Sequence, residues 1–183
     1  MSTVRKILLF PYLLIFILTV FASSCTKPGK PNDSNSQQSS NSDTEEFIHF
    51  LEHPPKDNQD SIITVIKQFF DNKTFSFEDK NGFMEDVVNA GNRFITKKSI
   101  SPAKVLALKS LETAQRLNME EFTIQNQLLL AEIYFIERKS DSAAYFVNRA
   151  EEKITGDFKN FEGSISHIRA KISELKGDNR QAI

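Results

Sequence analysis

Two of the three histidines have a spacing that would suit metal binding. His49 and His53 lie four residues apart, which places two imidazole rings on the same side of a helix, as a pair of metal ligands requires. However, Pro54 disfavours helical geometry in the residue before it, and no cysteine or third histidine is near in the sequence. We therefore interpret this pair as surface residues and expect no metal site.

The remaining acid–base candidates do not form a catalytic pattern. His167 stands alone, which favours a groove or core residue over a catalytic base. The acidic pairs are typical of helix starts and solvated faces; they are Glu45-Glu46, Glu120-Glu121 and Glu151-Glu152. No phosphate-binding loop, nucleophile elbow or zinc-binding spacing occurs in the sequence. The sequence therefore predicts neither an enzyme nor a cofactor site.

Cys25 is the only cysteine, and it follows a segment with the features of an export signal. Arg5 and Lys6 form a short basic region, and residues 7–22 form an apolar run. This run is shorter than the ~20 apolar residues that a membrane span needs. The small residues 22–24 lead directly into Cys25, and a signal peptidase accepts small side chains there because its cleft encloses an extended substrate.

This arrangement resembles a bacterial lipobox. The resemblance implies that residues 1–24 are a lipoprotein signal peptide and that Cys25 carries a lipid. Ser24 departs from the glycine or alanine that is more usual before the cysteine. A lone cysteine has no partner for an internal disulfide, which agrees with lipidation in an exported protein. Two other interpretations stay open: an incidental cysteine after an ordinary secretory signal, and an uncleaved anchor.

The segment after Cys25 has the composition of a linker. No aliphatic or aromatic residue occurs from Thr26 to Asp43. Such a segment buries too little apolar surface to offset its ordering entropy, so residues 25–43 are expected to form a flexible tether. Thr26 and Lys27 are not acidic, which in lipoproteins of this resemblance favours the outer membrane. The predicted location is the bacterial cell envelope, lipid-anchored and facing the periplasm.

The rest of the chain has the composition of one all-α domain. Of the sixteen phenylalanines in the full sequence, thirteen follow the tether; with no tryptophan present, they supply a core of large aromatic volume, while glycine, proline and β-branched alternation are sparse. The net charge is −1, and removal of Arg5 and Lys6 with the signal makes it −3. Because no basic stripe is present, nucleic acid is not expected as a partner.

Apolar periodicity and capping residues predict the helices after the tether. Thr44 is expected to cap the first helix, and Ser101-Pro102 to begin the fourth. The predicted helices are 44–51, 62–70, 81–97, 103–117, 120–139, 141–153 and 161–176. The N-terminal helices, within 44–80, are expected to pack on a repeat region that spans 81–183.

Small residues recur through these helices with a period near 40. The first set is Gly91, Ala131 and Ala170, and the second set, twelve residues later, is Ala103, Ala143 and Ala182. Small residues facing each other on two helices let the backbones approach closely. An aromatic residue one turn after the first small residue, Phe94 or Tyr134, then fills the space beside that contact.

This pattern resembles the tetratricopeptide repeat (TPR), a pair of antiparallel helices. One unit matches the signature in order, with alanine for glycine and valine for phenylalanine: Leu130-Ala131, Tyr134, Ala143, Val147 and Ala150. The units before and after it match more thinly. The resemblance implies helical hairpins stacked as a short α-solenoid over residues 82–183, and HEAT-like units are the structural alternative. The extra residues of the long period are expected between units, near 118–122 and 155–160.

The resemblance implies a binding function. Stacked hairpins expose a concave groove formed mainly by the first helix of each unit, so a scaffold or adaptor that binds a protein or peptide partner is expected. Polar residues away from the small positions would line this groove: Asn89, Asn92, Arg93, Asn126, Gln127, Arg169 and Ser173. Ordinary surface is the other interpretation of these residues. The alternative functions are an N-terminal sensory fragment of a TPR-containing signalling or transcriptional regulator, and an enzyme of the cell envelope.

The third unit is expected to be incomplete. Ala182 takes the place of Ala103 and Ala143, and only Ile183 follows it. The helix over 161–176 would then have an apolar face with no second helix to cover it, and it would fray or pair with another copy. The residues of that face are Ile165, Ile168, Ile172 and Leu175.

Overall fold

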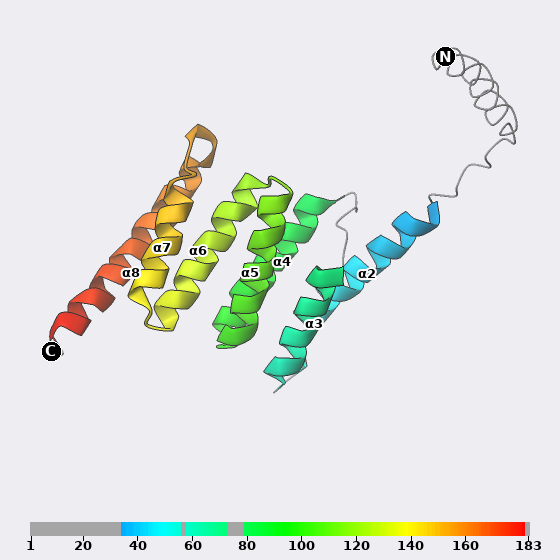
Figure 1. Cartoon of the computed structure of the whole chain (residues 1–183), viewed down its shortest axis with the longest axis horizontal. Helices are drawn as coiled ribbons and strands as arrows, with labels where there is room; N and C mark the ends of the chain where they lie inside the picture. The colour runs from blue at the N-terminus through cyan, green and yellow to red at the C-terminus, as the bar shows by residue number, and fades with distance from the viewer. Residues whose placement is uncertain (1–33, 56–57, 73–78, 182–183) are drawn as a thin grey trace, which may run out of the picture. The chain divides into compact units, whose positions relative to one another are not determined.

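The computed structural model describes residues 34–55, 58–72 and 79–181, and every regular element within these ranges is helical (Figure 1). The elements are α2 (Ser34–Glu52), α3 (Gln59–Asn72), α4 (Lys80–Thr96), α5 (Ile100–Arg116), α6 (Glu120–Ile136), α7 (Ser140–Glu151), the 3-10 helix η1 (Gly156–Phe161) and α8 (Glu162–Gln181). The predicted all-α class is thus confirmed for the described ranges. The interpretations of Cys25, of the signal segment and of Ala182 lie outside the described residues. No helix in the described ranges is both long enough and apolar enough to cross a membrane.

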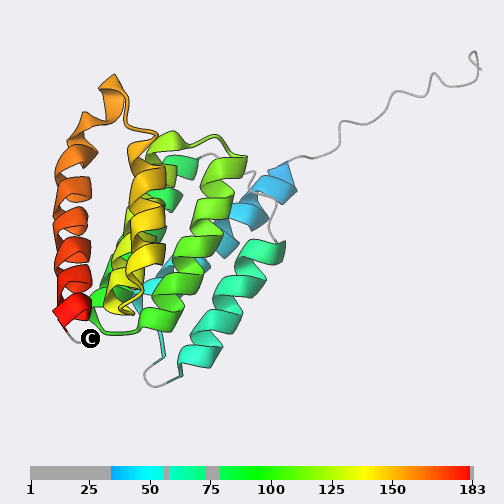
Figure 2. The ribbon, with the colours of Figure 1, turned by 60° about the vertical axis from the view of Figure 1, so that its left-hand side comes forward.

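The helices from α3 to α8 pack in two layers. One layer holds α4, α6 and α8, which contact one another in that order, and α3 contacts α5 in the other layer. Contacts between the layers join α4 to α5, α5 to α6, α6 to α7 and α7 to α8. Figure 2 shows α3, α5 and α7 in front of α4 and α6. From α4 to α8, consecutive helices are therefore antiparallel neighbours, and alternate helices run in the same direction.

Three tight turns set the length of the central helices. Lys98, Asn118 and Arg138 have left-handed backbone conformations, with φ angles of 60°, 54° and 57°. At the first of these turns the N–H of Lys98 donates to the carbonyl of Ile95 at 2.9 Å, and the next N–H donates five residues back at 2.8 Å. This is the Schellman arrangement that ends many helices. Because α4, α5 and α6 each have 17 residues, a helix with its turn repeats every 20 residues.

This geometry corrects the predicted origin of the 40-residue period. The extra residues predicted near 118–122 are absent, because a three-residue turn connects α5 directly to α6. The residues that make the period longer lie inside the helices. The apolar stripes of these helices pack against the neighbouring helices along their whole length. Near 155–160 the prediction is confirmed, since η1 is inserted there between α7 and α8.

Aromatic packing holds the N-terminal helices to the rest. Phe47 of α2 stacks on Phe69 of α3 with ring centroids 3.8 Å apart. Phe70 and Phe83 meet this pair at centroid distances of 5.6–6.4 Å. The same core includes Leu51 of α2 and continues through α4 and α5 into α6. The aromatic volume noted in the sequence is thus used to join α2, α3 and α4.

Helix α6 belongs to two cores. Leu130 and Ile133 pack in the core shared with α2, α3, α4 and α5, together with Leu129. Ile124 and Leu128 pack in a second core with α7 and α8. A helix that is apolar on nearly all sides is typically buried between neighbours on both flanks. Helix α6 is therefore the element that joins the two halves of this unit.

The small residues of the predicted register take different positions. Ala131 and Ala143 are fully buried in the same core, as close helix contact requires. Gly91 is also buried, but its close neighbour is in α6: a Cβ atom added there would lie 2.6 Å from Cδ2 of Leu129. Ala170 is exposed. The register therefore marks close packing in the first two units and not at Ala170.

The prediction that the apolar face of the 161–176 helix lacks a cover is wrong. Its four residues are only 4–6% exposed, namely Ile165, Ile168, Ile172 and Leu175. The three isoleucines share a core with Val147 and Ala150 of α7. The preceding hairpin, α6 with α7, covers this face, since a helix stacked on a repeat array buries its stripe against the unit before it.

Helices α2, α3 and α5 begin at least two residues earlier than predicted. Helix α2 begins at Ser34 rather than Thr44, so part of the expected tether is helical. No proline follows Pro31 before this helix ends, and the backbone therefore meets no barrier to extension towards its N-terminus. Helix α5 begins at Ile100 rather than Pro102. Pro102 lacks a backbone N–H group, but this costs nothing in the first turn, because N–H groups there have no hydrogen-bond partner within the helix.

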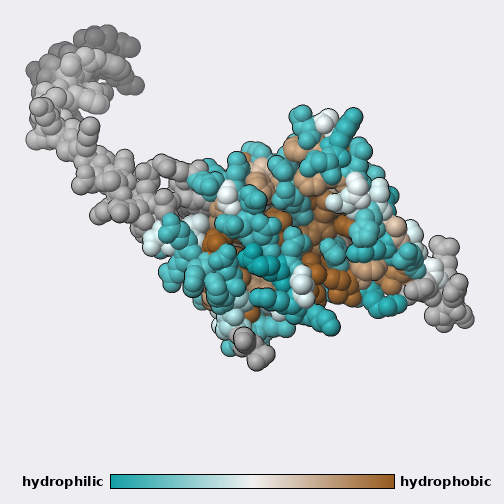
Figure 3. All heavy atoms as spheres, turned by 180° about the vertical axis from the view of Figure 1, so that it is seen from behind, coloured by the Kyte–Doolittle hydropathy of each residue, from teal (hydrophilic) through white to brown (hydrophobic). Residues whose placement is uncertain are grey.

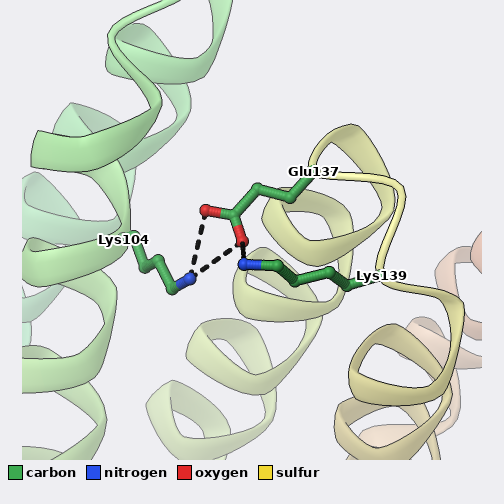
Figure 4. A network of polar contacts seen from close by, with 3 residues as sticks. All are labelled: Lys104, Glu137 and Lys139. Carbon is green, nitrogen blue, oxygen red and sulfur yellow. Dashed lines mark hydrogen bonds and ion pairs between the residues drawn. The ribbon is translucent and has the colours of Figure 1, made fainter.

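An ion network joins α5 to the end of α6 (Figure 4). Nζ of Lys104 donates to the two carboxylate oxygens of Glu137 at 3.1 and 2.9 Å, and Nζ of Lys139 donates to Oε2 of Glu137 at 2.8 Å. Nζ of Lys104 also lies 4.2 Å from the centroid of the Tyr134 ring, within cation–π range. This network fixes the turn after α6 to the first turns of α5.

Candidate functional site

A groove of about 1020 Å³ runs along the layer formed by α4, α6 and α8. Its polar lining consists of Asn81, Glu85, Asn89, Asn92, Asn118, Glu120, Glu121, Gln125, Glu132, Ser164 and His167, and its apolar lining of Val88, Met119, Phe122, Leu128, Leu129, Phe158, Phe161 and Ile168. Figure 3 shows the molecule from behind, with a band of hydrophobic residues in a hollow between hydrophilic ones.

The 40-residue register explains why α4 and α6 line one groove. Their equivalent lining residues are Asn81 and Glu121, Glu85 and Gln125, Val88 and Leu128, Asn89 and Leu129, and Asn92 and Glu132. Along each helix these equivalent residues follow one another at intervals of four, three, one and three positions, so they form one stripe of the helix surface. Two helices that run in the same direction thus present the same stripe to the same groove.

The floor of the groove is apolar. Val88, Leu128, Leu129 and Ile168 are 5–9% exposed, so they pack on the cores below and still reach the groove surface. A floor of this kind favours the burial of apolar side chains from a ligand, at about 25 cal/mol for each Å² removed from water.

The charged lining of the groove is acidic: four glutamates and no lysine or arginine occur among its described residues. Two of these glutamates are paired with lysines outside the lining. Oε1 of Glu120 lies 3.3 Å from Nζ of Lys153, and Oε1 of Glu132 lies 3.5 Å from Nζ of Lys171. These two pairs offset half of the negative charge.

The other two glutamates form no ion pair with any described residue; they are Glu85 of α4 and Glu121 of α6. Oε1 of Glu121 accepts a hydrogen bond from Nε2 of Gln125 at 3.3 Å, and this bond brings no positive charge. Both side chains are exposed at the groove. The groove therefore keeps a net negative charge.

Three of the predicted groove residues lie in this region. Asn89 and Asn92 line the groove and are exposed. Arg93 does not line it, but lines a smaller adjoining hollow together with the two asparagines, Thr96 and Lys97. His167 is exposed and lines the groove, which agrees with its predicted groove or core position.

Two further predicted residues lie outside the groove. Arg169 forms an ion pair with Glu151, and its Nη2 donates to Oδ1 of Asn148 at 2.9 Å, so its side chain is engaged with α7. Ser173 is exposed on α8 but is not part of the lining. Both predictions are wrong. The predicted residues do not lie at the same number of positions from the small residue of each unit.

The prediction for Asn126 and Gln127 is also wrong, because these side chains are 0% and 2% exposed. Nδ2 of Asn126 donates to the carbonyl of Phe122 at 2.8 Å. Oδ1 of Asn126 and Oε1 of Gln127 have no hydrogen-bond partner among the described residues. Gln127 occupies the register position of Val87, which is 1% exposed, so it lies in the core and faces no partner.

The 40-residue register relates the groove residues that were not predicted to those that were. Relative to Gly91 in α4 and to Ala131 in α6, the lining residues fall at the same offsets. Applying the offsets of Asn89 and Asn92 to α6 gives Leu129 and Glu132, not Asn126 and Gln127. This comparison requires the position of the groove on one helix, which the sequence alone does not supply.

The described residues show no arrangement for metal binding. No group of three or more His, Cys, Asp or Glu side chains among them is placed to hold a metal ion. His49 and His53 stack with ring centroids 4.7 Å apart. The described groups whose pKa values depart clearly from ordinary ones are Lys104, Lys109 and Glu137, and they lie outside the groove. The groove is suited to binding through apolar contacts, hydrogen bonds and charge.

Comparison of this chain with protein families, with curated proteins and with solved structures found no match.

Proposed function

We propose that this chain is a lipid-anchored protein of the bacterial cell envelope whose TPR-like helical hairpins bind a protein or peptide partner. In this proposal the hairpins act as a non-catalytic scaffold or adaptor, and the groove along α4, α6 and α8 holds the partner. Cys25 carries the lipid, and the segment after it links the lipid to the helical unit.

The groove is the observation that supports this proposal most strongly. It combines an apolar floor with a polar rim, and its lining repeats between α4 and α6. Its volume of about 1020 Å³ is at the upper end of small-molecule pockets. An open groove of this size along parallel helices suits an extended or helical segment of polypeptide.

The anchor is tested by replacing Cys25 with serine and fractionating bacterial cells that express the full chain. The wild-type chain is expected in the membrane fraction, and the Cys25→Ser chain is expected unprocessed or released. A variant that is processed normally and stays membrane-bound would contradict the lipid anchor.

The groove is tested by photo-cross-linking in living cells. A photoreactive phenylalanine analogue at Asn92 lies on the groove, whereas the same analogue at Glu174 lies on exposed α8 surface outside it. Adducts of defined mass are expected from position 92 and not from position 174. Equal adducts from both positions, or none from position 92, would contradict a partner in the groove.

A further inference from the structure

We infer that the partner in the groove is a cationic amphipathic polypeptide segment, with apolar side chains on the floor and lysine or arginine side chains at Glu85 and Glu121. This inference rests on the proposed function and specifies the chemistry of the partner.

Charge is the first argument for this partner. Glu85 and Glu121 line the groove from two neighbouring helices, and neither forms an ion pair with a described residue. Both side chains are exposed, so an arriving cation meets them without displacing another. Complementary charge speeds encounter with the right partner and disfavours partners of like charge.

The helix N-termini at this groove are not free to attract an anion. The backbone N–H of Gly82 in the first turn of α4 donates to Oδ1 of Asp79 at 2.8 Å. The first turn of α6 carries Glu120 and Glu121, whose negative charges face the positive end of the helix dipole. The partial positive charges of both helix ends are thus already matched by carboxylates of the chain.

The floor supplies the second requirement. Val88, Leu128 and Leu129 line the same groove as the acidic residues of α4 and α6, so a bound segment meets both apolar surface and carboxylates there. Phe158 and Phe161 are half-buried in the lining and add aromatic surface to the groove, and aromatic rings attract cationic side chains. A segment that alternates apolar and basic groups satisfies both surfaces, whereas a purely polar cation leaves the floor exposed.

Among the described lining residues of the groove and of the smaller adjoining hollow, arginine and lysine occur only in the hollow. Arg93 and Lys97 line the smaller hollow near the end of α4, which shares Asn89 and Asn92 with the groove. The preference for a cation therefore belongs to the part of the groove near the beginnings of α4 and α6.

The test uses two fluorescent peptides and the full chain in phosphatidylcholine nanodiscs. One peptide is an amphipathic helix-forming sequence of leucine and lysine, and the other has glutamate in place of every lysine. Fluorescence anisotropy gives each Kd after subtraction of the signal from empty nanodiscs. The lysine peptide is expected to bind at least about tenfold more tightly, the effect of two charge pairs at a partly exposed site.

Two pairs of variants with the same change in charge separate the groove from the general surface. Glu85→Gln with Glu121→Gln is expected to raise the Kd of the lysine peptide about tenfold at low salt. Glu52→Gln with Glu174→Gln, on exposed surface outside the groove, is expected to change it less than about twofold. Asn89→Lys with Asn92→Lys is expected to weaken the lysine peptide and to strengthen the glutamate peptide. Far-UV circular dichroism checks that each variant stays helical.

Four outcomes would overturn the inference. Tighter binding of the glutamate peptide would leave the proposed function standing with a partner of the opposite charge. Equal effects of the two glutamine pairs would place the binding outside the groove. A dimer in analytical ultracentrifugation that the groove variants convert to monomer would show that the occupant is a second copy of this chain. Binding of neither peptide, together with no cross-link from position 92, would reject the proposed function as well.

Discussion

At the scale of single residues, Glu137 and Lys104 couple the stability of the helical unit to pH. Burial alone would raise the pKa of Glu137, but the hydrogen bonds and charges of Lys139 and Lys104 together hold it below its ordinary value of 4.5. Its stabilising contribution is therefore complete above pH 4.5 and is lost as the pH falls through the folded-state pKa. Burial lowers the pKa of Lys104, but the hydrogen bond and charge of Glu137, with Tyr134, raise it above 10.5. That contribution is complete below pH 10.5 and is lost as the pH rises through the folded-state pKa.

Replacing Glu137 with glutamine is expected to lower the free energy of unfolding by about 1 kcal/mol at neutral pH, because the charge pairing is lost in a half-buried site. The difference from wild type is expected to shrink as the pH falls below 4.5, where wild-type Glu137 loses its own charge. Urea unfolding over the acid range measures this, with Glu174→Gln, an exposed site, as the control. A difference that stays constant down to about pH 2 would show that shape rather than charge is responsible.

At the scale of helices, the left-handed turn residues store backbone strain. Lys98 and Arg138 have φ angles of 60° and 57°, a region that costs a residue with a Cβ atom about 1 kcal/mol and costs glycine nothing. Lys98→Gly or Arg138→Gly is therefore expected to raise the free energy of unfolding by roughly 0.5–1 kcal/mol. Asn118→Gly is expected to gain less, since asparagine tolerates this conformation. Denaturant unfolding measures these changes. A loss of stability in both Lys98→Gly and Arg138→Gly would show that the two residues are not strained.

Close packing of α6 against α7 gives a second prediction at this scale. Ala131→Leu or Ala143→Leu is expected to lower the free energy of unfolding by ~1–3 kcal/mol, because both alanines are fully buried and a larger side chain overpacks the core. Ala170→Leu, at the equivalent register position in α8, is expected to have little effect because Ala170 is exposed. Thermal melts of the three variants test this. Equal losses in all three would show that burial does not distinguish the sites.

The sequence predicts the helices better than it predicts which of their sides are exposed. Apolar periodicity and turn residues are local, so the helices from α3 to α8 and the register of Ala131 with Ala143 follow from the sequence. The fate of Gln127 depends on which helices flank α6, because a polar side chain in an apolar helix has no periodic pattern to place it. The groove helices are thus predictable, while Glu85 and Glu121 are not recognised as groove residues without the packing of α4 on α6.

At the scale of the whole helical unit, α6 couples the two cores. Ile66 lies in the core of α2 to α6, and Ile172 lies in the core of α6 to α8. Neither core is complete without α6, since Leu130 contributes to the first and Ile124 to the second. Loss of either core thus exposes one side of α6 and removes the support of the other core. The helices from α2 to α8 are therefore expected to unfold in a single transition, although a longer repeat array unfolds in parts.

Replacing Ile66 or Ile172 with alanine is expected to lower the free energy of unfolding by about 2–5 kcal/mol in either core. The two losses are expected to add in the double variant, since the residues share no partner. Far-UV circular dichroism reports all helices, and the near-UV signal reports Tyr134, which packs against both cores, and Tyr145, whose ring contacts Phe146 of α7. Because α6 couples the cores, both signals are expected to change at the same urea concentration in every variant. If the near-UV signal of Ile172→Ala is lost first while most helical signal remains, α7 and α8 unfold by themselves and α6 does not transmit their loss to the first core.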